Sequence, residues 1–129
     1  MYLPISLSAA AAAAIVNLWL SIRIGQVRNA KKISVGDAGD EGLIRRMRAQ
    51  ANFIENAPLV LILIAVIEAA RPGNAWLAGV AGAFTLARVA HGVGMDGGPL
   101  RAGRMVGTLV TMLSQLGLAV WAATIAYTM

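Results

Sequence analysis

Four long apolar stretches alternate with short polar segments along the chain. They occupy residues 3–24, 43–70, 75–94 and 101–128. A helix needs about 20 apolar residues to cross a hydrocarbon core of roughly 30 Å, and each stretch reaches that length. The pattern therefore predicts an all-α fold with four membrane-spanning helices. Because the connections are short, we expect an up-down four-helix bundle that forms one domain over residues 1–129.

Signals within and between these stretches predict local structure. Asp37 or Asp40 is expected to cap the second helix, because an aspartate side chain accepts hydrogen bonds from the first free backbone N–H groups of a helix. Small residues cluster in the first and third helices, at Ala9 to Ala14 and around Gly79 and Gly82. Such faces allow close helix packing within a membrane.

Composition agrees with an integral membrane protein. Hydrophobic residues make up 58% of the chain and charged residues 13%, with a mean hydropathy of +0.69. Soluble domains are usually about one quarter charged. The absence of cysteine excludes disulfides and cysteine nucleophiles, and the single histidine, His91, argues against a metal site. The net charge of +5 does not indicate nucleic-acid binding, because the basic residues lie beside apolar spans.

Basic residues are distributed unevenly among the three predicted loops. The second loop carries only Arg71. The first and third loops and their flanks carry Arg28, Lys31, Lys32, Arg45, Arg46, Arg48, Arg101 and Arg104. Because positive charge favours the cytoplasmic side, we expect these two loops in the cytoplasm and both termini outside it.

A polar stripe at the start of the second span is the main candidate site. Arg45, Arg48, Asn52 and Glu55 follow one another at i, i+3, i+7 and i+10, and so share one helix face. The stripe continues into an apolar run, where polar residues are costly and usually functional. The alternative is a solvated helix end whose arginines reach the headgroup layer. That alternative explains arginines, but not an asparagine and a glutamate on the same face.

Glu55 and Arg88 are expected at similar depth in the membrane. Counted from the outer ends of their helices at 1.5 Å per residue, Glu55 lies roughly 22 Å and Arg88 roughly 24 Å deep. Opposite charges at equal depth predict a pair, direct or through a ligand. His91 lies one turn from Arg88 on the same face. Three further arginines are expected nearer the cytosolic edge: Arg48, Arg101 and Arg104.

These residues together form a cationic cluster that also contains one carboxylate and one amide. Guanidinium groups bind carboxylates bidentately, and a carboxylate among arginines suits an ammonium group. A ligand with both groups resembles an amino acid or a small peptide. An internal ion-pair network that only holds the helices together explains the spacing equally well.

The segment Arg48-Ala49-Gln50-Ala51-Asn52-Phe53-Ile54-Glu55-Asn56-Ala57-Pro58 resembles the MAPEG family, the membrane-associated proteins of eicosanoid and glutathione metabolism. It matches the pattern R-A-x-x-N-x-x-E-x-x-P at the start of that family's second helix. The resemblance covers nearly the whole chain. It includes the four spans, the basic first loop, a third helix ending in residues 87–94 and the Leu100-Arg101 pair that opens the fourth helix.

This resemblance implies a homotrimer that binds glutathione between subunits on the cytosolic side. Arg48, Asn52 and Glu55 match the family's glutathione-binding residues, and Gln50 matches a glutamine from the adjacent subunit. Arg101 resembles the arginine that stabilises the glutathione thiolate, with Arg104 as its rival. With the cationic cluster, the candidate ligand-binding residues are Arg28, Arg48, Gln50, Asn52, Glu55, Arg88, His91 and Arg104, and the candidate catalytic residue is Arg101.

The mechanism that the resemblance implies needs no protein nucleophile. An arginine beside the thiol would lower its pKa from about 8.5, the value of a free cysteine thiol. The thiolate would then attack a lipophilic small molecule dissolved among the membrane lipids, as in a transferase or peroxidase.

The chain departs from eicosanoid-type members at three positions. It has Asn56, His91 and Met95 where those members have tyrosines. These departures favour a bacterial-type or generic transferase, which we expect in a bacterial inner membrane. Two other functions remain open. A non-catalytic member of the family is one, and a small multidrug-type transporter is the other. Such a transporter needs an acidic residue in its first span, and residues 3–22 contain none.

Overall fold

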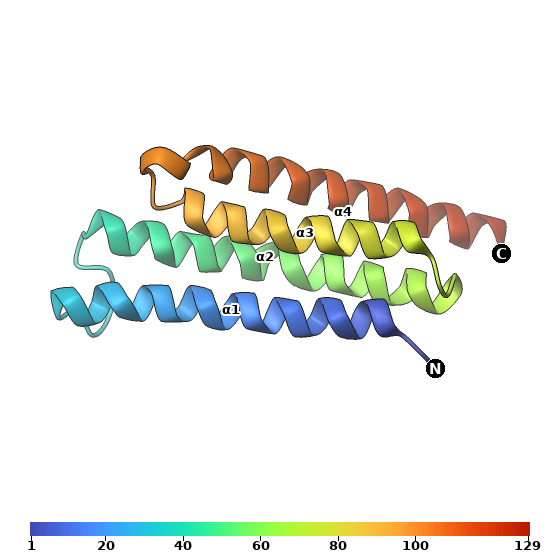
Figure 1. The fold of residues 1–129 in the computed structure, drawn as a ribbon, viewed down its shortest axis with the longest axis horizontal. Coiled ribbons are helices and arrows are strands. Elements are labelled where there is room, and N and C mark those ends of the chain that lie inside the picture. The colour runs from blue at the N-terminus through green and yellow to red at the C-terminus, as the bar shows by residue number, and fades with distance from the viewer.

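The chain folds into four antiparallel helices in the computed structural model, which describes all 129 residues (Figure 1). The elements are α1 (Pro4–Lys31), α2 (Glu41–Ala70), α3 (Ala75–Gly94), a 3-10 turn η1 (Gly98–Leu100) and α4 (Ala102–Thr128). All four helices are long and apolar enough to cross a membrane. The prediction of an all-α fold with four candidate membrane spans is therefore confirmed.

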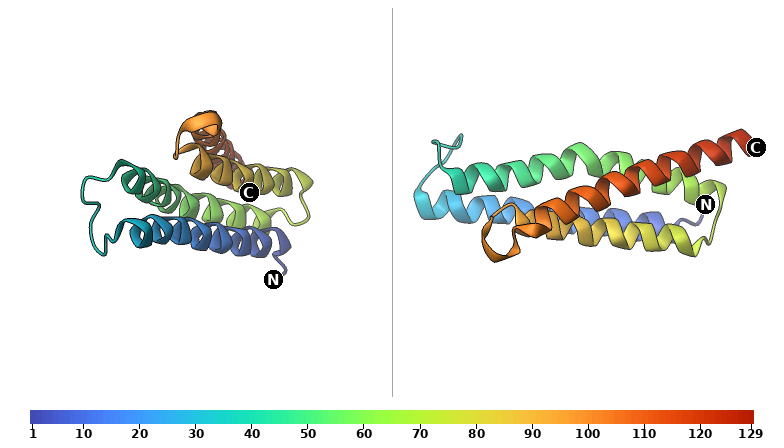
Figure 2. Two further views of the ribbon diagram at one scale, coloured as in Figure 1. Left: turned by 60° about the vertical axis from the view of Figure 1, so that its left-hand side comes forward. Right: turned by 90° about the horizontal axis from the view of Figure 1, so that it is seen from above.

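The two ends of the bundle differ. Both termini and the α2–α3 turn lie at one end, which we call the terminal end (Figure 1). The α1–α2 and α3–α4 connections lie at the other, which we call the charged end. Figure 2 shows α1 and α2 side by side and α4 running along α3, with which it makes the most extensive helix contact.

The N-termini of α2 and α3 are each capped by the side chain of the residue that precedes the helix. Asp40 accepts a hydrogen bond from the Leu43 backbone N–H at 2.8 Å, which confirms it as the cap of α2. Its carboxylate also pairs with Lys31 at the end of α1. The hydrogen bond from Lys31, followed by that from Leu43, holds the pKa of Asp40 below its usual range. Asn74 caps α3 in the same way.

The start of α1 is capped by a side chain of α2. Glu68 is fully buried, and its carboxylate accepts from the backbone N–H groups of Ile5 at 2.9 Å and Ser6 at 2.8 Å. The Ser6 hydroxyl donates a third hydrogen bond at 2.6 Å. A carboxylate is favoured at this position, because the free N–H groups of a helix N-terminus carry partial positive charge. The contact ties α1 to α2 at the terminal end, and it was not predicted from the sequence.

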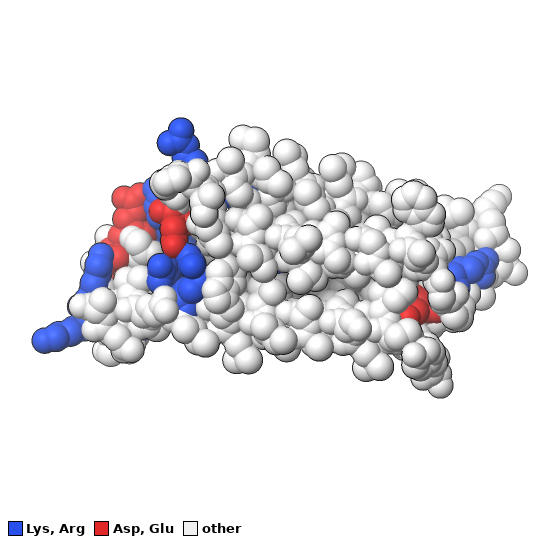
Figure 3. All heavy atoms as spheres, in the orientation of Figure 1, with Lys and Arg blue, Asp and Glu red and all other residues white.

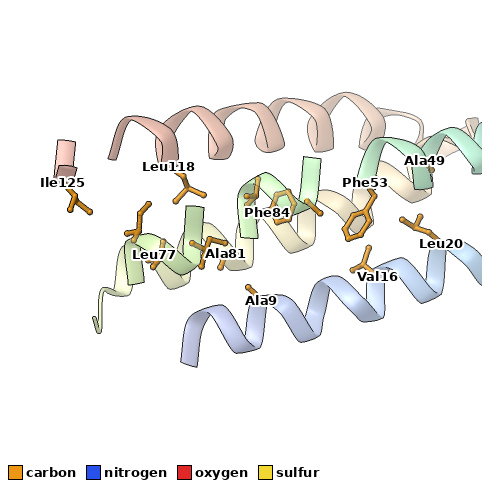
Figure 4. Close-up of a cluster of buried hydrophobic side chains, with 14 residues drawn as sticks. Ala9, Val16, Leu20, Ala49, Phe53, Leu77, Ala81, Phe84, Leu118 and Ile125 are labelled. Atoms are coloured by element: carbon orange, nitrogen blue, oxygen red, sulfur yellow. The ribbon is translucent and has the colours of Figure 1, made fainter. Parts of the chain in front are cut away.

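The core is a thin apolar seam between the helices. Figure 4 shows Phe53 of α2 pointing toward Val16 and Leu20 of α1, while Leu77 of α3 and Leu118 of α4 lie further along the same seam. Many large apolar side chains face outward instead, as expected for a surface in contact with hydrocarbon. Burial in this bundle is therefore confined to a minority of each helix's side chains.

The backbones of α3 and α4 approach each other directly. A Cβ atom added at Gly107 would lie 2.5 Å from the carbonyl oxygen of Ala87, and one at Gly103 would lie 2.4 Å from that of Ala90. The two glycines are four residues apart, the spacing of the small-residue motif that lets membrane helices pack closely. This spacing is visible in the sequence, although it was not among the predicted packing faces.

The predicted close packing at Gly79 and Gly82 is not found within the chain. A Cβ atom at either position would have no neighbour within 4 Å. The small side chains of α1 and α3 leave an open apolar groove of about 550 Å³ instead, with Ala9 and Gly82 on its walls. The reason is that α3 packs against α4 with a different face, the one that carries Ala87 and Ala90.

Candidate functional site

Figure 3 shows one face of the molecule, on which most of the charged side chains lie at the charged end of the bundle. Arg48 and Glu55 of α2 form the most exposed pair near the predicted site. Their side chains are each 57% exposed, and Arg48 Nη1 lies 3.7 Å from Glu55 Oε1. A cation and a carboxylate are thus available side by side on an open helix face.

Glu55 and Arg88 do not pair directly, because Glu55 turns to Arg48 and Arg88 turns to Asn52. The other predicted arrangement, a pair through a ligand, stays a prediction. Asn52 and Glu55 are three residues apart, which separates them by about 60° around the helix axis. This angle is enough to direct Asn52 toward α3 while Glu55 faces outward.

Arg88 lies at the centre of a buried polar network that joins three helices. It is 2% exposed. Its Nη2 donates to Asn52 Oδ1 at 2.6 Å and lies 3.5 Å from Nδ1 of the equally buried His91, while its Nη1 donates to Thr111 Oγ1 at 3.0 Å. No carboxylate pairs with this guanidinium. Sequence reasoning missed Thr111, although it lies four residues after Gly107 and therefore on the α4 face that meets α3.

Gln50 and Arg28 lie on the other side of α2. Gln50 Nε2 donates to Ser21 Oγ at 2.6 Å, and Arg28 Nη1 donates to the carbonyl oxygen of Gly36 at 2.7 Å. Both residues line a hollow of about 390 Å³ between α1 and α2, which Glu55 also borders. Only Glu55 therefore faces both sides of α2.

Arg48 and Gln50 leave α2 in different directions. They are two residues apart and so point about 160° away from each other around α2. The predicted site residues thus form two groups around α2, with Glu55 between them. One comprises Arg48 and Glu55 with Asn52 behind them, and the other comprises Arg28 and Gln50.

The remaining arginines stand at the start of α4. Arg101 and Arg104 are both exposed, and neither side chain makes a hydrogen bond or an ion pair. Arg101 follows a tight connection in which Gly97 and Gly98 adopt φ values of 81° and 70°, a region that favours glycine. Both guanidinium groups are free to bind an anion.

Asp96 anchors this connection to the rest of the bundle. Its carboxylate accepts a hydrogen bond from Arg46 Nε of α2 at 3.2 Å and pairs with Arg23 of α1. Burial alone would raise the pKa of Asp96, but the hydrogen bonds and charges of Arg46 and Arg23 outweigh it, so that the pKa is lowered. The carboxylate therefore stays ionised at neutral pH and holds the segment that carries Arg101. This ion-pair cluster was not predicted.

Comparison with known proteins agrees with this architecture. No curated protein matches the chain. The model of the MAPEG family matches residues 6–124, which include most of every helix and all of the candidate site residues. The chain belongs to the MAPEG family.

Proposed function

We propose that this protein is a glutathione-dependent membrane transferase or peroxidase. The observation that carries the proposal is the exposed pair of Arg48 and Glu55 beside Asn52. Glutathione has an ammonium group and a carboxylate at its γ-glutamyl end, which an arginine and a glutamate a few ångströms apart can bind together. Family membership supports this choice of thiol. The charge of the loops favours a site that faces the cytoplasm.

The proposed chemistry joins a thiolate to an electrophile from the bilayer. In a transfer, the glutathione sulfur forms a bond to an electrophilic carbon, and the leaving group departs with the bonding electron pair. In a peroxidase reaction, the sulfur attacks a hydroperoxide oxygen and releases the alcohol, and a second glutathione then yields the disulfide and water. Arg101 is the proposed catalytic residue, because its free cation can stabilise the thiolate.

A homotrimer is part of the proposal, because one chain carries Arg48 and Gln50 on faces of α2 that point about 160° away from each other. The first group of one copy can meet the second group of the next copy. Such a contact joins unlike surfaces, and it closes into a ring such as a trimer when the rotation between neighbouring copies is a whole fraction of a turn. The exposed α2 stripe also carries apolar residues, and a second copy would shield Glu55 from lipid. Native mass spectrometry of the detergent-purified protein measures the copy number, and a monomer would contradict this assembly.

Glu55→Gln should lower the affinity for glutathione about ten-fold or more, because a charge-assisted hydrogen bond contributes about 1.5–3 kcal/mol. Isothermal titration of the purified protein measures the effect. Glu41→Gln is the matched control. Glu41 is another exposed glutamate of α2, paired with Arg45 at 2.8 Å, but it lies two turns before Arg48. Equal affinities for both variants would remove Glu55 from the site.

A non-catalytic role is the second candidate, and one observation favours it. Asn56, which replaces the tyrosine of eicosanoid-type members, donates its amide to the backbone oxygen of Asn52 at 2.8 Å. Asparagine has no hydroxyl to offer a ligand, and this amide is engaged within α2. If the unaltered protein binds no glutathione, this second candidate is preferred. The transporter alternative lacks support, because α1 contains no acidic residue.

A further inference from the structure

Arg88 is a buried charge that has no opposite charge beside it. It is 2% exposed, its guanidinium contacts only neutral oxygen atoms and His91, and its Nε has no hydrogen-bond partner. Removing a cation from water without a carboxylate partner is costly. A leucine or methionine would fill the same space without that cost. The arginine therefore has a role beyond packing α3 against its neighbours.

Its strongest contact is with the amide of Asn52. Arg88 Nη2 donates to Asn52 Oδ1 at 2.6 Å. A guanidinium can only donate hydrogen bonds, so it fixes which end of the amide faces inward. The oxygen of Asn52 is held against Arg88, and its NH2 group lies on the opposite side of the amide carbon. Asn52 Nδ2 makes no hydrogen bond within the chain, and it is not among the buried atoms that lack a partner. The NH2 group is thus accessible and free to donate.

We propose that Arg88 is a positioning residue, which acts on the ligand through Asn52 without touching it. This inference rests on the proposed function. Arg88 fixes the orientation of the amide, so that two N–H donors face the ligand beside Arg48 and Glu55. The charge of Arg88 also polarises the amide, and hydrogen bonds in such a chain strengthen one another. The natural acceptor for these donors is a carboxylate or peptide oxygen of glutathione.

The support of Arg88 extends to α4, which begins directly after the proposed catalytic residue Arg101. Thr111 of α4 accepts from Arg88 Nη1 at 3.0 Å. The chain of contacts therefore runs from α4 through α3 to α2, and it depends on the close approach of α3 and α4 at Gly107. This link gives Thr111 a testable role. Thr111→Val removes one anchor of the Arg88 guanidinium and should loosen its hold on Asn52, while both of these residues stay in place.

A double-mutant cycle with glutathione as the titrant tests the inference. Arg88→Met should weaken glutathione binding about ten-fold in the unaltered background, since a hydrogen bond to a charged group is lost. In the Asn52→Ala background the same substitution should change the affinity less than two-fold, because the amide through which Arg88 acts on the ligand is already absent. A residue that only stabilises the fold, or that binds the ligand directly, would weaken binding equally in both backgrounds. That additive result overturns the inference.

Two further measurements keep the test decisive. If Arg88→Met does not fold, Thr111→Val replaces it in the same cycle, and it should weaken binding several-fold only where Asn52 is present. The side-chain amide signals of Asn52 in 15N NMR report its orientation without ligand, and they should shift in the Arg88 or Thr111 variant. Unshifted signals contradict the inference. If the unaltered protein binds no glutathione, the proposed function fails and the inference fails with it. Binding with an additive cycle overturns the inference alone.

Discussion

Gly107→Ala should strongly lower the melting temperature of the bundle, whereas Gly117→Ala on the same helix should leave it unchanged or slightly higher. The added Cβ at Gly107 would lie 2.5 Å from the Ala87 carbonyl oxygen and 2.6 Å from His91 Cβ. A backbone atom cannot turn aside as a flexible side chain can, so α3 and α4 must separate. Overpacking of this kind costs about 1–3 kcal/mol.

Gly117 provides the control, because a Cβ atom there would meet nothing within 4 Å. Alanine is favoured over glycine inside a helix by about 0.5–1 kcal/mol, so that Gly117→Ala should be neutral or stabilising. Thermal unfolding followed by circular dichroism in detergent compares the two variants. Gly103→Ala should resemble Gly107→Ala, since its Cβ would lie 2.4 Å from the Ala90 oxygen. Equal melting temperatures for all three variants would contradict the close α3–α4 packing.

Separation of α3 from α4 should also disturb the proposed ligand site. The hydrogen bond between Arg88 and Thr111 crosses this helix contact one turn beyond Gly107. Moving the helices apart lengthens that bond and loosens the network that holds Asn52. Gly107→Ala should therefore bind glutathione more weakly than Gly117→Ala at a temperature where both variants are folded.

Arg101→Ala should lower turnover about a hundred-fold, the effect typical of removing one group that stabilises developing negative charge. The affinity for glutathione should fall much less, because the interaction strengthens as the thiolate forms. Removing the cation destabilises the thiolate relative to the thiol, so the pKa of bound glutathione should rise. Ultraviolet absorbance of the thiolate, followed against pH, measures that shift, and steady-state kinetics measures turnover.

Arg104→Ala is the matched control for this prediction. Arg104 lies three residues later, in the first turn of α4, and it is likewise exposed without a side-chain partner. We expect it to change neither the turnover nor the thiolate titration. A shift in Arg104→Ala with none in Arg101→Ala would transfer the role to Arg104. No shift in either variant would exclude activation of the thiol by these arginines.

Features that depend on near neighbours in the chain were predicted correctly. The four apolar stretches gave the number of helices and the all-α fold, because the length and polarity of a span are set within the span itself. The cap at Asp40 was also correct, since it bonds to a backbone group only three residues away. The motif from Arg48 to Pro58 indicated the family to which the chain belongs. The fold class was therefore fully accessible from the sequence.

Contacts between helices far apart in the sequence were decided by the tertiary structure. Asn52 and Glu55 point about 60° apart around the axis of α2. Which of the two side chains contacts Arg88 depends on how α2 is rotated against α3, and the structure selects Asn52. The same rotation left Gly79 and Gly82 open and brought Gly107 against Ala87. Glu68 and Asp96 accept hydrogen bonds from residues more than 45 positions away in the chain, and no local sequence pattern predicts such contacts. A sequence fixes what each helix face carries, but only packing decides which face it meets, because small changes in rotation exchange one set of neighbours for another.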